Sequence, residues 1–438
     1  MKILLLSCST GEGHNHCALA VKEALQRLGH QAEFLDMLNM FGDPGPLSFD
    51  KVLNRISTKA PDIFGMMYHA GQMYSATGVT SPVYLANIRH AKQLCDFICE
   101  REYDAVLCSH LFPMETLTYL RRHGQYPTRC YGILSDYACI PFLVETELDG
   151  YFLPHLDVKA DCVRAGLPEE RLFVTGMPVA EKFAAPMSRE EARALLGLPQ
   201  DQKIYLIMTG GIGCGDAVSL CNAIRRVPDT QSLLCVLPGR NEELRSTLES
   251  EYHGDGVLTV PFTDKVAVYM HAADVLLSKA GGISSSEAAV LGVPLVHTMA
   301  IPGVETLNAE FFARHGMSFF ARNVDEAARF ADRLIYDARA AERMLSAQET
   351  QLPKDGADRA HGDGDAPITA KPGVFAPGCC GEKETGMTEV MPVFLYTRCR
   401  NGGREAVCAA FGLIHAEIPR VSSTRPTYPQ ARCRLKRC

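Results

Sequence analysis

The sequence predicts an α/β protein in which two domains, each built on a parallel β-sheet, face one another across a cleft. Three observations support this fold class. Buried-strand and amphipathic-helix patterns alternate through the first half of the 438-residue chain. A second alternating series begins after a connector, and glycine-rich segments follow strands in both halves. Strands separated by helices pair in parallel, and such sheets bind ligands at the carboxyl ends of their strands.

The first domain is expected to span residues 1–176. The apolar run Lys2–Ser7 predicts its first strand, because the run is too short for a signal peptide and leads directly into a glycine loop. Apolar residues at helical spacing then predict a helix over His14–Leu28, which Gly29 ends. The same patterns predict strands at Ala32–Leu35, Ala105–Cys108, Arg129–Leu134 and Gly150–Leu153, and a helix at Ile88–Arg101.

Residues 177–198 are expected to link the domains, with a helix at Arg189–Leu196. The second domain is expected over 199–350. Its predicted strands are Ile204–Met208, Ser232–Leu237, Val257–Val260, Val275–Leu277 and Leu295–His297. A helical pattern continues to Arg359 and then stops. Residues 351–438 hold many prolines and glycines without sustained periodicity, so we expect an atypical, disordered tail.

Composition excludes several classes of protein. Hydrophobic residues make up 47% and charged residues 22%, as in soluble globular proteins. The net charge of −7 disfavours nucleic acid as a partner. No apolar run is long enough to span a membrane. The chain has 17 cysteines at irregular spacings, which we interpret as reduced thiols, with no metal site and no cofactor.

The segment from Ser278 to Ala289 is the most informative part of the chain. A buried strand runs into Gly281 and Gly282, and serines and Glu287 then open a helical pattern. Glycines let backbone N–H groups approach an anion, and a helix N-terminus adds partial positive charge. A carboxylate repels phosphate but accepts hydrogen bonds from a ribose diol. The segment therefore predicts a site for a phosphorylated nucleoside.

A first glycine loop, Ser9 to Asn15, follows the opening strand. Its position suits a polar ligand, although it does not match the dinucleotide pattern. It contains His14, and an imidazole, whose unperturbed pKa is about 6.5, can accept a proton at cellular pH. The alternative is a helix-start histidine whose nitrogens are satisfied by the backbone.

Two further strand ends carry polar residues. Asp136 follows a predicted strand, where it could act as a base or orient His14; the alternative is a turn or N-cap aspartate. Arg240 and Asn241 follow Gly239 at another strand end, and an arginine can bind a diphosphate with two hydrogen bonds. The alternative for Arg240 is a surface salt bridge.

The segment Asp62–Tyr84 interrupts the strand–helix alternation and is rich in methionine and aromatic residues. Such residues at helical spacing usually pack into a core. An apolar surface beside a cleft would equally suit a lipid acceptor and docking at a membrane interface.

Together these motifs resemble one family, the monogalactosyldiacylglycerol synthases and processive diacylglycerol glucosyltransferases, which are glycosyltransferase family 28-like proteins. The resemblance covers residues 1 to about 350 and rests on six segments in family order: Gly11 to Asn15, Ser135-Asp136, Gly176 to Val179, Gly239 to Asn241, Lys279 to Glu287, and Pro302 to Asn308. It implies a GT-B fold of two Rossmann-like domains. The second domain would bind a UDP-sugar, and the first a diacylglycerol-type lipid.

The resemblance also implies roles for single residues. Glu287 would hold the ribose, with Phe262 near the uracil and Arg240 beside the nucleotide. Glu305 and Asn308 would face the sugar hydroxyls, and His14, with Asp136, would be catalytic. The other implied donor contacts are Gly211, Asn241, Gly281, Gly282, Ser284 and Ser285, and the implied acceptor contacts are Gly11, Gly13 and Asn15. The reaction would be an inverting displacement without a metal, with the UDP-sugar as a substrate.

Two positions depart from the family pattern. Val304 stands where a glutamine is common, which affects the identity of the sugar, and Ile140 to Phe142 stand where tryptophan and histidine are common, which affects the acceptor. The resemblance implies a hexosyltransferase in the cytoplasm, peripheral on the inner face of the cell membrane. Alternatives are an N-acetylglucosaminyltransferase acting on a polyprenyl-linked acceptor, a UDP-sugar epimerase, and a non-catalytic paralogue that binds a nucleotide sugar.

Overall fold

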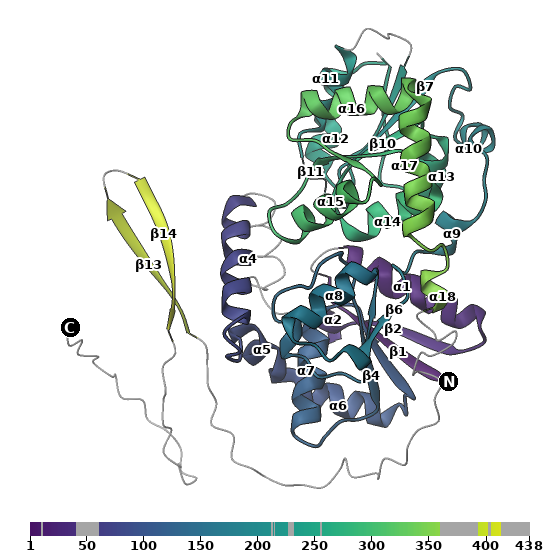
Figure 1. Ribbon diagram of the computed structural model, residues 1–438. Helices are drawn as coiled ribbons and strands as arrows, with labels where there is room; N and C mark the ends of the chain where they lie inside the picture. Colours follow the sequence, from purple (N-terminus) through teal and green to yellow (C-terminus); the bar gives the residue numbers. More distant parts are fainter. Residues whose placement is uncertain are drawn as a thin grey trace, which may run out of the picture. The chain divides into compact units, whose positions relative to one another are not determined.

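The structure is a computed structural model (Figure 1). It describes residues 1–9, 12–40, 61–211, 213, 215–226, 232–254, 256–359, 393–401 and 404–412. The chain divides into two compact units, Met1–Cys379 and Cys380–Cys438. The first unit contains two α/β domains, and every residue considered for the site belongs to it.

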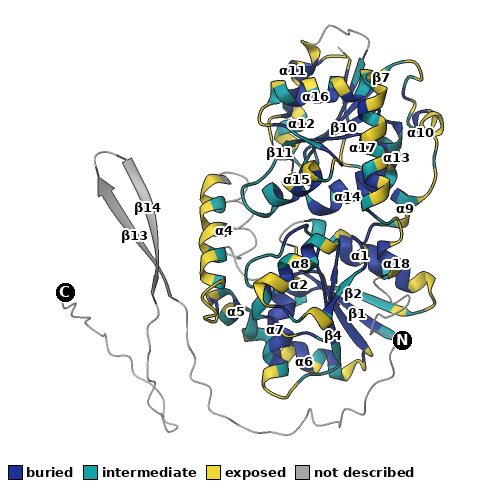
Figure 2. Cartoon of the chain, viewed as in Figure 1, coloured by how far each residue is buried: buried dark blue, intermediate teal, exposed yellow. Residues whose placement is uncertain are grey.

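The first domain is built on a six-stranded sheet of order β2-β1-β3-β4-β5-β6, with all neighbours parallel. The central strands are buried along their length, as dark ribbons in Figure 2 show, because helices cover both faces of the sheet. Its strands are β1 (Lys2–Ser7), β2 (Gln31–Asp36), β3 (Ala105–Cys108), β4 (Arg129–Ile133), β5 (Gly150–Leu153) and β6 (Leu172–Val174).

The helices of the first domain connect these strands. They are α1 (Glu12–Arg27), α2 (Met37–Met40), α4 (Pro61–Ser75), α5 (Pro82–Asn87), η1 (Ile88–His90), α6 (Ala91–Glu100), α7 (Leu111–Arg122), η2 (Leu143–Glu145), α8 (Leu156–Ala165) and η3 (Glu169–Arg171). Helix α4 comes from the segment that interrupts the alternation. Much of α4 is exposed (Figure 2).

The second domain has a parallel sheet of order β12-β11-β10-β7-β8-β9. Its strands are β7 (Lys203–Met208), β8 (Ser232–Leu237), β9 (Val257–Thr259), β10 (Val275–Lys279), β11 (Leu295–Met299) and β12 (Phe319–Phe320). The helices from the linker onward are α9 (Glu181–Ala184), α10 (Arg189–Leu196), α11 (Ala217–Arg225), α12 (Glu242–Glu251), α13 (Val266–Ala272), α14 (Gly282–Leu291), α15 (Val304–Arg314), α16 (Val324–Tyr336), α17 (Ala338–Gln351) and α18 (Gly356–Arg359). The predicted fold class, with two parallel-sheet α/β domains, is confirmed.

The structure describes two parts of the segment from residue 351 onward that was expected to form the tail. Residues 352–359 pack on the end of the first domain: a Cβ at Gly176 would lie 2.5 Å from Pro353, and one at Gly356 would lie 2.5 Å from the Met177 carbonyl oxygen. Further on, β13 (Val393–Asn401) and β14 (Arg404–Gly412) form an antiparallel pair. β-Branched and aromatic residues in these two runs favour strands. The rest of the predicted tail lies outside the described residues.

Two further properties bear on the setting of the protein. Among the described residues, no helix combines the length and apolarity needed to cross a bilayer. The ten cysteines whose side chains are described are free thiols, and most of them are buried.

Candidate active site

The second domain presents an open helix N-terminus at the predicted glycine segment. Strand β10 ends at Lys279, and α14 begins at Gly282 with Gly281 as its N-cap and no side chain capping it. The first backbone N–H groups of a helix have no partner within the helix, so an uncapped terminus favours an anion. Gly282 also touches the first domain, since a Cβ there would lie 2.2 Å from the Ser135 carbonyl oxygen.

Lys279 is a candidate diphosphate-binding residue that is not among the site residues predicted from the sequence. A Cβ at Gly210 would lie 2.6 Å from Lys279 Cε, and one at Gly281 would lie 3.8 Å from its Nζ. The ammonium group therefore lies between the glycine turns that follow β7 and β10, where it forms an ion pair with Glu305. Its place at the end of a buried strand, directly before the glycine segment, was the available signal.

Glu287 lies on the second turn of α14, with only 6% of its surface exposed. Burial raises the pKa of its carboxyl to about 8, and the charge of Lys182 opposes that shift. Among the described residues, no hydrogen bond reaches the carboxyl group. A buried polar group without a partner is costly, so this side chain is suited to a ligand that donates hydrogen bonds, such as a diol.

His14 lies on the first turn of α1 and is held by the ends of two strands of the first sheet. Its Nδ1 is 3.0 Å from the Ser109 carbonyl oxygen and 2.8 Å from Ser135 Oγ. A carbonyl oxygen can only accept, so Nδ1 carries the proton in this contact and Nε2 keeps its lone pair. Ser135 therefore connects the two domains here: its hydroxyl contacts the His14 imidazole, and its carbonyl oxygen lies against Gly282 at the start of α14.

Asp136 and Asn308 join the two domains. Asn308 Nδ2 donates to Asp136 Oδ1 at 2.8 Å, and Asn308 Oδ1 accepts from the Tyr137 backbone N–H at 2.8 Å. Asn308 is fully buried and also donates to the Ala280 carbonyl oxygen. In this structure the Asn308 amide is bound at the contact between the domains, and its implied role in binding sugar hydroxyls stays a prediction.

The serines of the glycine segment have different surroundings. Ser285 is buried, and its hydroxyl pairs with His297 Nε2 at 2.9 Å while its N–H donates to the Gly281 carbonyl oxygen. Both groups are hydrogen-bonded within the protein, and the implied phosphate contact from Ser285 stays a prediction. Ser284 remains partly exposed. Successive helical residues point about 100° apart, which explains why the two serines differ.

Two other implied donor contacts are also occupied. Glu305 forms an ion pair with Lys279 and accepts from the Ile301 N–H at 3.1 Å, so it does not offer a free carboxylate to a sugar. Asn241 caps α12, accepting from the Leu244 N–H, and donates to the Gly213 carbonyl oxygen. An asparagine followed by acidic residues is a common helix cap, and this explains its position.

Arg240 contacts groups from both domains. Its guanidinium forms an ion pair with Glu12 and lies 4.3 Å from the centroid of the Phe262 ring. A Cβ at Gly211 would lie 2.8 Å from Glu12 Cγ, so the two predicted glycine loops are in contact here. The Phe262 ring is exposed and Glu12 is the partner of the Arg240 cation, and the nucleotide contacts implied for Arg240 and Phe262 stay predictions.

The predicted acceptor contacts lie on the opposite loop. Gly13 faces α14, since a Cβ there would lie 3.7 Å from Ile283 Cγ1. Asn15 donates to Ser9 Oγ at 3.0 Å, and its Oδ1 is buried without a partner among the described residues. Gly11 lies outside the described residues.

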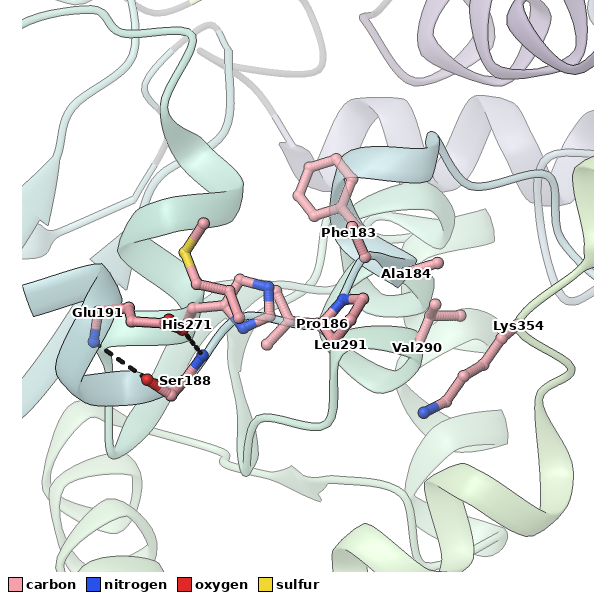
Figure 3. A pocket seen from close by; sticks show the side chains of 11 residues that line it. Phe183, Ala184, Pro186, Ser188, Glu191, His271, Val290, Leu291 and Lys354 are labelled. Carbon is pink, nitrogen blue, oxygen red and sulfur yellow. Dashed lines mark hydrogen bonds between the residues drawn. The ribbon is translucent and has the colours of Figure 1, made fainter. Parts of the chain in front are cut away.

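Two other features lie away from these residues. A hollow of about 430 Å³ is lined by the linker and the end of α14 (Figure 3), and none of the predicted site residues lines it. Among the described residues, His155, Asp157 and His315 are grouped closely enough to hold a metal ion. Asp157 is already paired with Arg314 at 3.1 Å, and His155 Nδ1 accepts from the Asp157 N–H, so these groups have partners of their own.

Comparison with known proteins places the chain in a family. Residues 14–179 match the model of monogalactosyldiacylglycerol (MGDG) synthase, and residues 218–345 match the glycosyltransferase family 28 C-terminal domain. The chain is 26% identical over 352 residues to a processive diacylglycerol beta-glucosyltransferase of Bacillus cytotoxicus, covering 79% of this chain and 88% of the relative. A protein described in the same words from Bacillus thuringiensis is 26% identical over 363 residues, covering 82% and 91%.

Solved structures support the fold. Acinetobacter baumannii MurG is similar with a TM-score of 0.52 and 16% identity, covering 82% of this chain and 97% of that one. The Staphylococcus aureus MnaA–UDP structure is similar with a TM-score of 0.54 and 14% identity, covering 82% and 94%. Both likenesses support the GT-B arrangement of two α/β domains. The chain therefore belongs to the monogalactosyldiacylglycerol synthase and processive diacylglycerol glucosyltransferase family of GT-B glycosyltransferases.

Proposed function

We propose that this protein transfers a hexose from a UDP-sugar to diacylglycerol or a related membrane lipid, with inversion at the anomeric carbon. The observation that carries the proposal is a contact between the two domains. Ser135 is hydrogen-bonded to His14 of the first domain, and its carbonyl oxygen lies against the uncapped start of α14 in the second. A proton acceptor and an anion-binding terminus at one boundary suit transfer from an anionic leaving group to a hydroxyl.

The acceptor side would work by general base catalysis. As the lipid hydroxyl attacks the anomeric carbon, its proton would move to His14 Nε2, because Nδ1 is engaged by the Ser109 carbonyl. The bond from the anomeric carbon to the diphosphate oxygen would break, and the electron pair would leave with UDP. Asp136 lies next to Ser135, but its carboxylate is bound to Asn308, so it suits positioning rather than proton transfer.

The donor side would stabilise the departing UDP. The N–H groups that open α14 face developing negative charge, and the Lys279 ammonium lies beside the same glycines. Glu287 would accept hydrogen bonds from the ribose hydroxyls, which would give its buried carboxyl the partners that it lacks. No step in this scheme requires a metal ion.

Docking to the inner face of the cell membrane would bring the lipid to the cleft. Along α4, Ile63, Met66, Met67 and Met73 are exposed by 55%, 73%, 45% and 75%. An interval of three or seven residues keeps side chains on one helix face, so Ile63, Met66 and Met73 form a single apolar stripe. Such a stripe suits a peripheral contact with lipid from the cytoplasm.

A reconstituted transfer assay tests the proposal. Purified protein is mixed with anionic vesicles that contain diacylglycerol and with UDP-glucose or UDP-galactose, and the lipid products are identified by mass spectrometry. A hexosyl-diacylglycerol with a β-linkage is expected. Protein that binds UDP but makes no glycolipid from either donor contradicts the proposal, and an α-linked product contradicts the inversion.

A further inference from the structure

We propose that Tyr68 of α4 contacts the substrate, its phenol hydroxyl binding a hydroxyl group of the hexose on the nucleotide donor. The inference rests on the proposed function and deepens it. It adds a residue of the first domain to the part of the cleft that holds the sugar, where the residues implied by sequence, Glu305 and Asn308, are engaged with protein groups.

The position of Tyr68 is set by close contact between α4 and the turn that begins α15. A Cβ at Gly303 would lie 2.9 Å from Tyr68 Cγ, and one at Gly65 would lie 2.6 Å from Pro302 Cβ. Gly303 also has a φ of 116°, which residues with a side chain rarely adopt. Glycine at both positions lets the aromatic ring lie on the backbone of the second domain, directly before Val304.

The phenol hydroxyl at this contact has no hydrogen-bond partner in the part of the chain that the structure describes. Tyr68 Oη is buried and makes no hydrogen bond among the described residues. Burial, with the nearby charges of Asp136 and Cys139, raises the pKa of the phenol, so the group stays protonated and is a hydrogen-bond donor. Native structures seldom leave a buried hydroxyl unpaired, because the loss of hydration is not compensated. A ligand hydroxyl would supply the missing acceptor.

The neighbouring groups identify the ligand chemistry. Val304 offers no polar atom, and Glu305 is paired with Lys279 and the Ile301 N–H. Tyr68 is neutral and lies near the charge of Asp136, which disfavours a phosphate. An alcohol can accept a hydrogen bond from the phenol, so a sugar hydroxyl suits the Tyr68 hydroxyl better than a phosphate does. Because the turn at Gly303 belongs to the second domain, the hydroxyl is assigned to the donor sugar.

The test removes one oxygen atom. Tyr68→Phe keeps the ring that packs on Gly303, so the fold should be retained. Tyr74→Phe is the matched control, because Tyr74 lies on the same helix and its hydroxyl donates to the Thr80 carbonyl at 3.2 Å. Calorimetry with UDP, UDP-glucose and UDP-galactose distinguishes the contribution of the nucleotide to the binding affinity from that of the sugar. We expect Tyr68→Phe to lower the affinity for the preferred UDP-hexose about tenfold, as for one lost hydrogen bond, and to leave the affinity for UDP unchanged.

Kinetics with vesicles that contain diacylglycerol distinguish the donor from the acceptor. The inference requires a higher KM for the UDP-hexose in Tyr68→Phe, with the KM for diacylglycerol and the properties of Tyr74→Phe unchanged. The inference is overturned if wild type and Tyr68→Phe bind the UDP-hexose with equal affinity, or if only the KM for diacylglycerol rises. In either case, formation of glycolipid by the wild type still supports the proposed function. A wild-type protein that binds neither UDP-hexose overturns both.

Discussion

The Asn308 side chain of the second domain is hydrogen-bonded to the Asp136 carboxylate of the first, with 2.8 Å between Nδ2 and Oδ1. The same amide accepts from the Tyr137 N–H, and the Tyr137 ring is stacked on Phe311 with 4.5 Å between centroids. The Tyr137 hydroxyl pairs with Ser286 at 2.7 Å. The end of strand β4 is thus held between α14 and α15, which places the candidate base and the candidate nucleotide site at one boundary.

Asn308→Ala should destabilise this contact. The substitution leaves the Tyr137 N–H and one Asp136 oxygen without their partner in a buried place, so we expect a loss of about 2–4 kcal/mol in the free energy of unfolding. Urea unfolding followed by circular dichroism measures it, because the chain has no tryptophan. Asn222→Ala is the control, since that exposed amide accepts one bond from Tyr252, and it should change stability by less than about 1 kcal/mol. Equal effects of the two substitutions would contradict the contact.

His14→Ala should abolish most of the transfer activity without weakening nucleotide binding. A general base contributes a factor of about 10²–10⁴ to the rate, so kcat should fall by that range. UDP affinity by calorimetry should be unchanged, because the imidazole is assigned to the acceptor side. His253→Ala, which alters an exposed histidine of the second domain, should behave as wild type. Full activity in His14→Ala would exclude the assigned base.

Glu287→Ala should weaken UDP binding by about 1–3 kcal/mol, the cost of lost hydrogen bonds to a charged or strongly polar group. A deoxy analogue provides a sharper comparison. If Glu287 binds the ribose, wild type should lose affinity for 2′-deoxy-UDP relative to UDP, and Glu287→Ala should not discriminate between them. Discrimination that survives in Glu287→Ala would assign the ribose to another residue.

Glu287 should also make stability depend on pH. Its folded pKa, about 8, lies above the ordinary glutamate value of 4.5, so the folded state binds the extra proton. The favourable contribution is therefore complete below about pH 4.5 and is lost as the pH rises through about 8. Glu287→Gln should lose less stability than wild type between pH 5 and 8.5 in urea titrations. Parallel curves for the two proteins would show that the carboxyl does not titrate in this way.

The apolar stripe on α4 should govern vesicle binding. Replacing Met66 and Met73 by serine removes much of the exposed apolar surface, and each buried methionine contributes up to about 1.5–3 kcal/mol. We expect the double variant to partition into anionic vesicles at least about tenfold less in co-sedimentation, with UDP affinity retained. Leu195→Ser is the control, because Leu195 is 65% exposed on α10 of the linker, away from α4 in the sequence. A similar loss in Leu195→Ser would indicate non-specific adsorption.

The sequence alone predicted the elements that depend on local patterns. Ala105–Cys108, Gly150–Leu153, Arg189–Leu196 and Ser232–Leu237 have the predicted bounds, because apolar periodicity and turn residues lie within each segment. Other elements shifted by a few residues at their ends; the predicted helix His14–Leu28, for example, begins at Glu12 and ends at Arg27. The uncapped glycines before α14, followed by an acidic residue, were also visible as a local signal.

Only the tertiary structure decided which polar groups of the cleft are already occupied. Asn308 and Asp136 are 172 residues apart, and His297 reaches Ser285 from the next strand. Tyr68 meets Gly303 from a helix that the sequence alone did not distinguish from core. A hydrogen bond across two domains has no sequence period, because it depends on how two separately folded sheets come together. The sequence therefore determined the two domains and the loops that face each other, and the packing between the domains determined which side chains remain for a ligand.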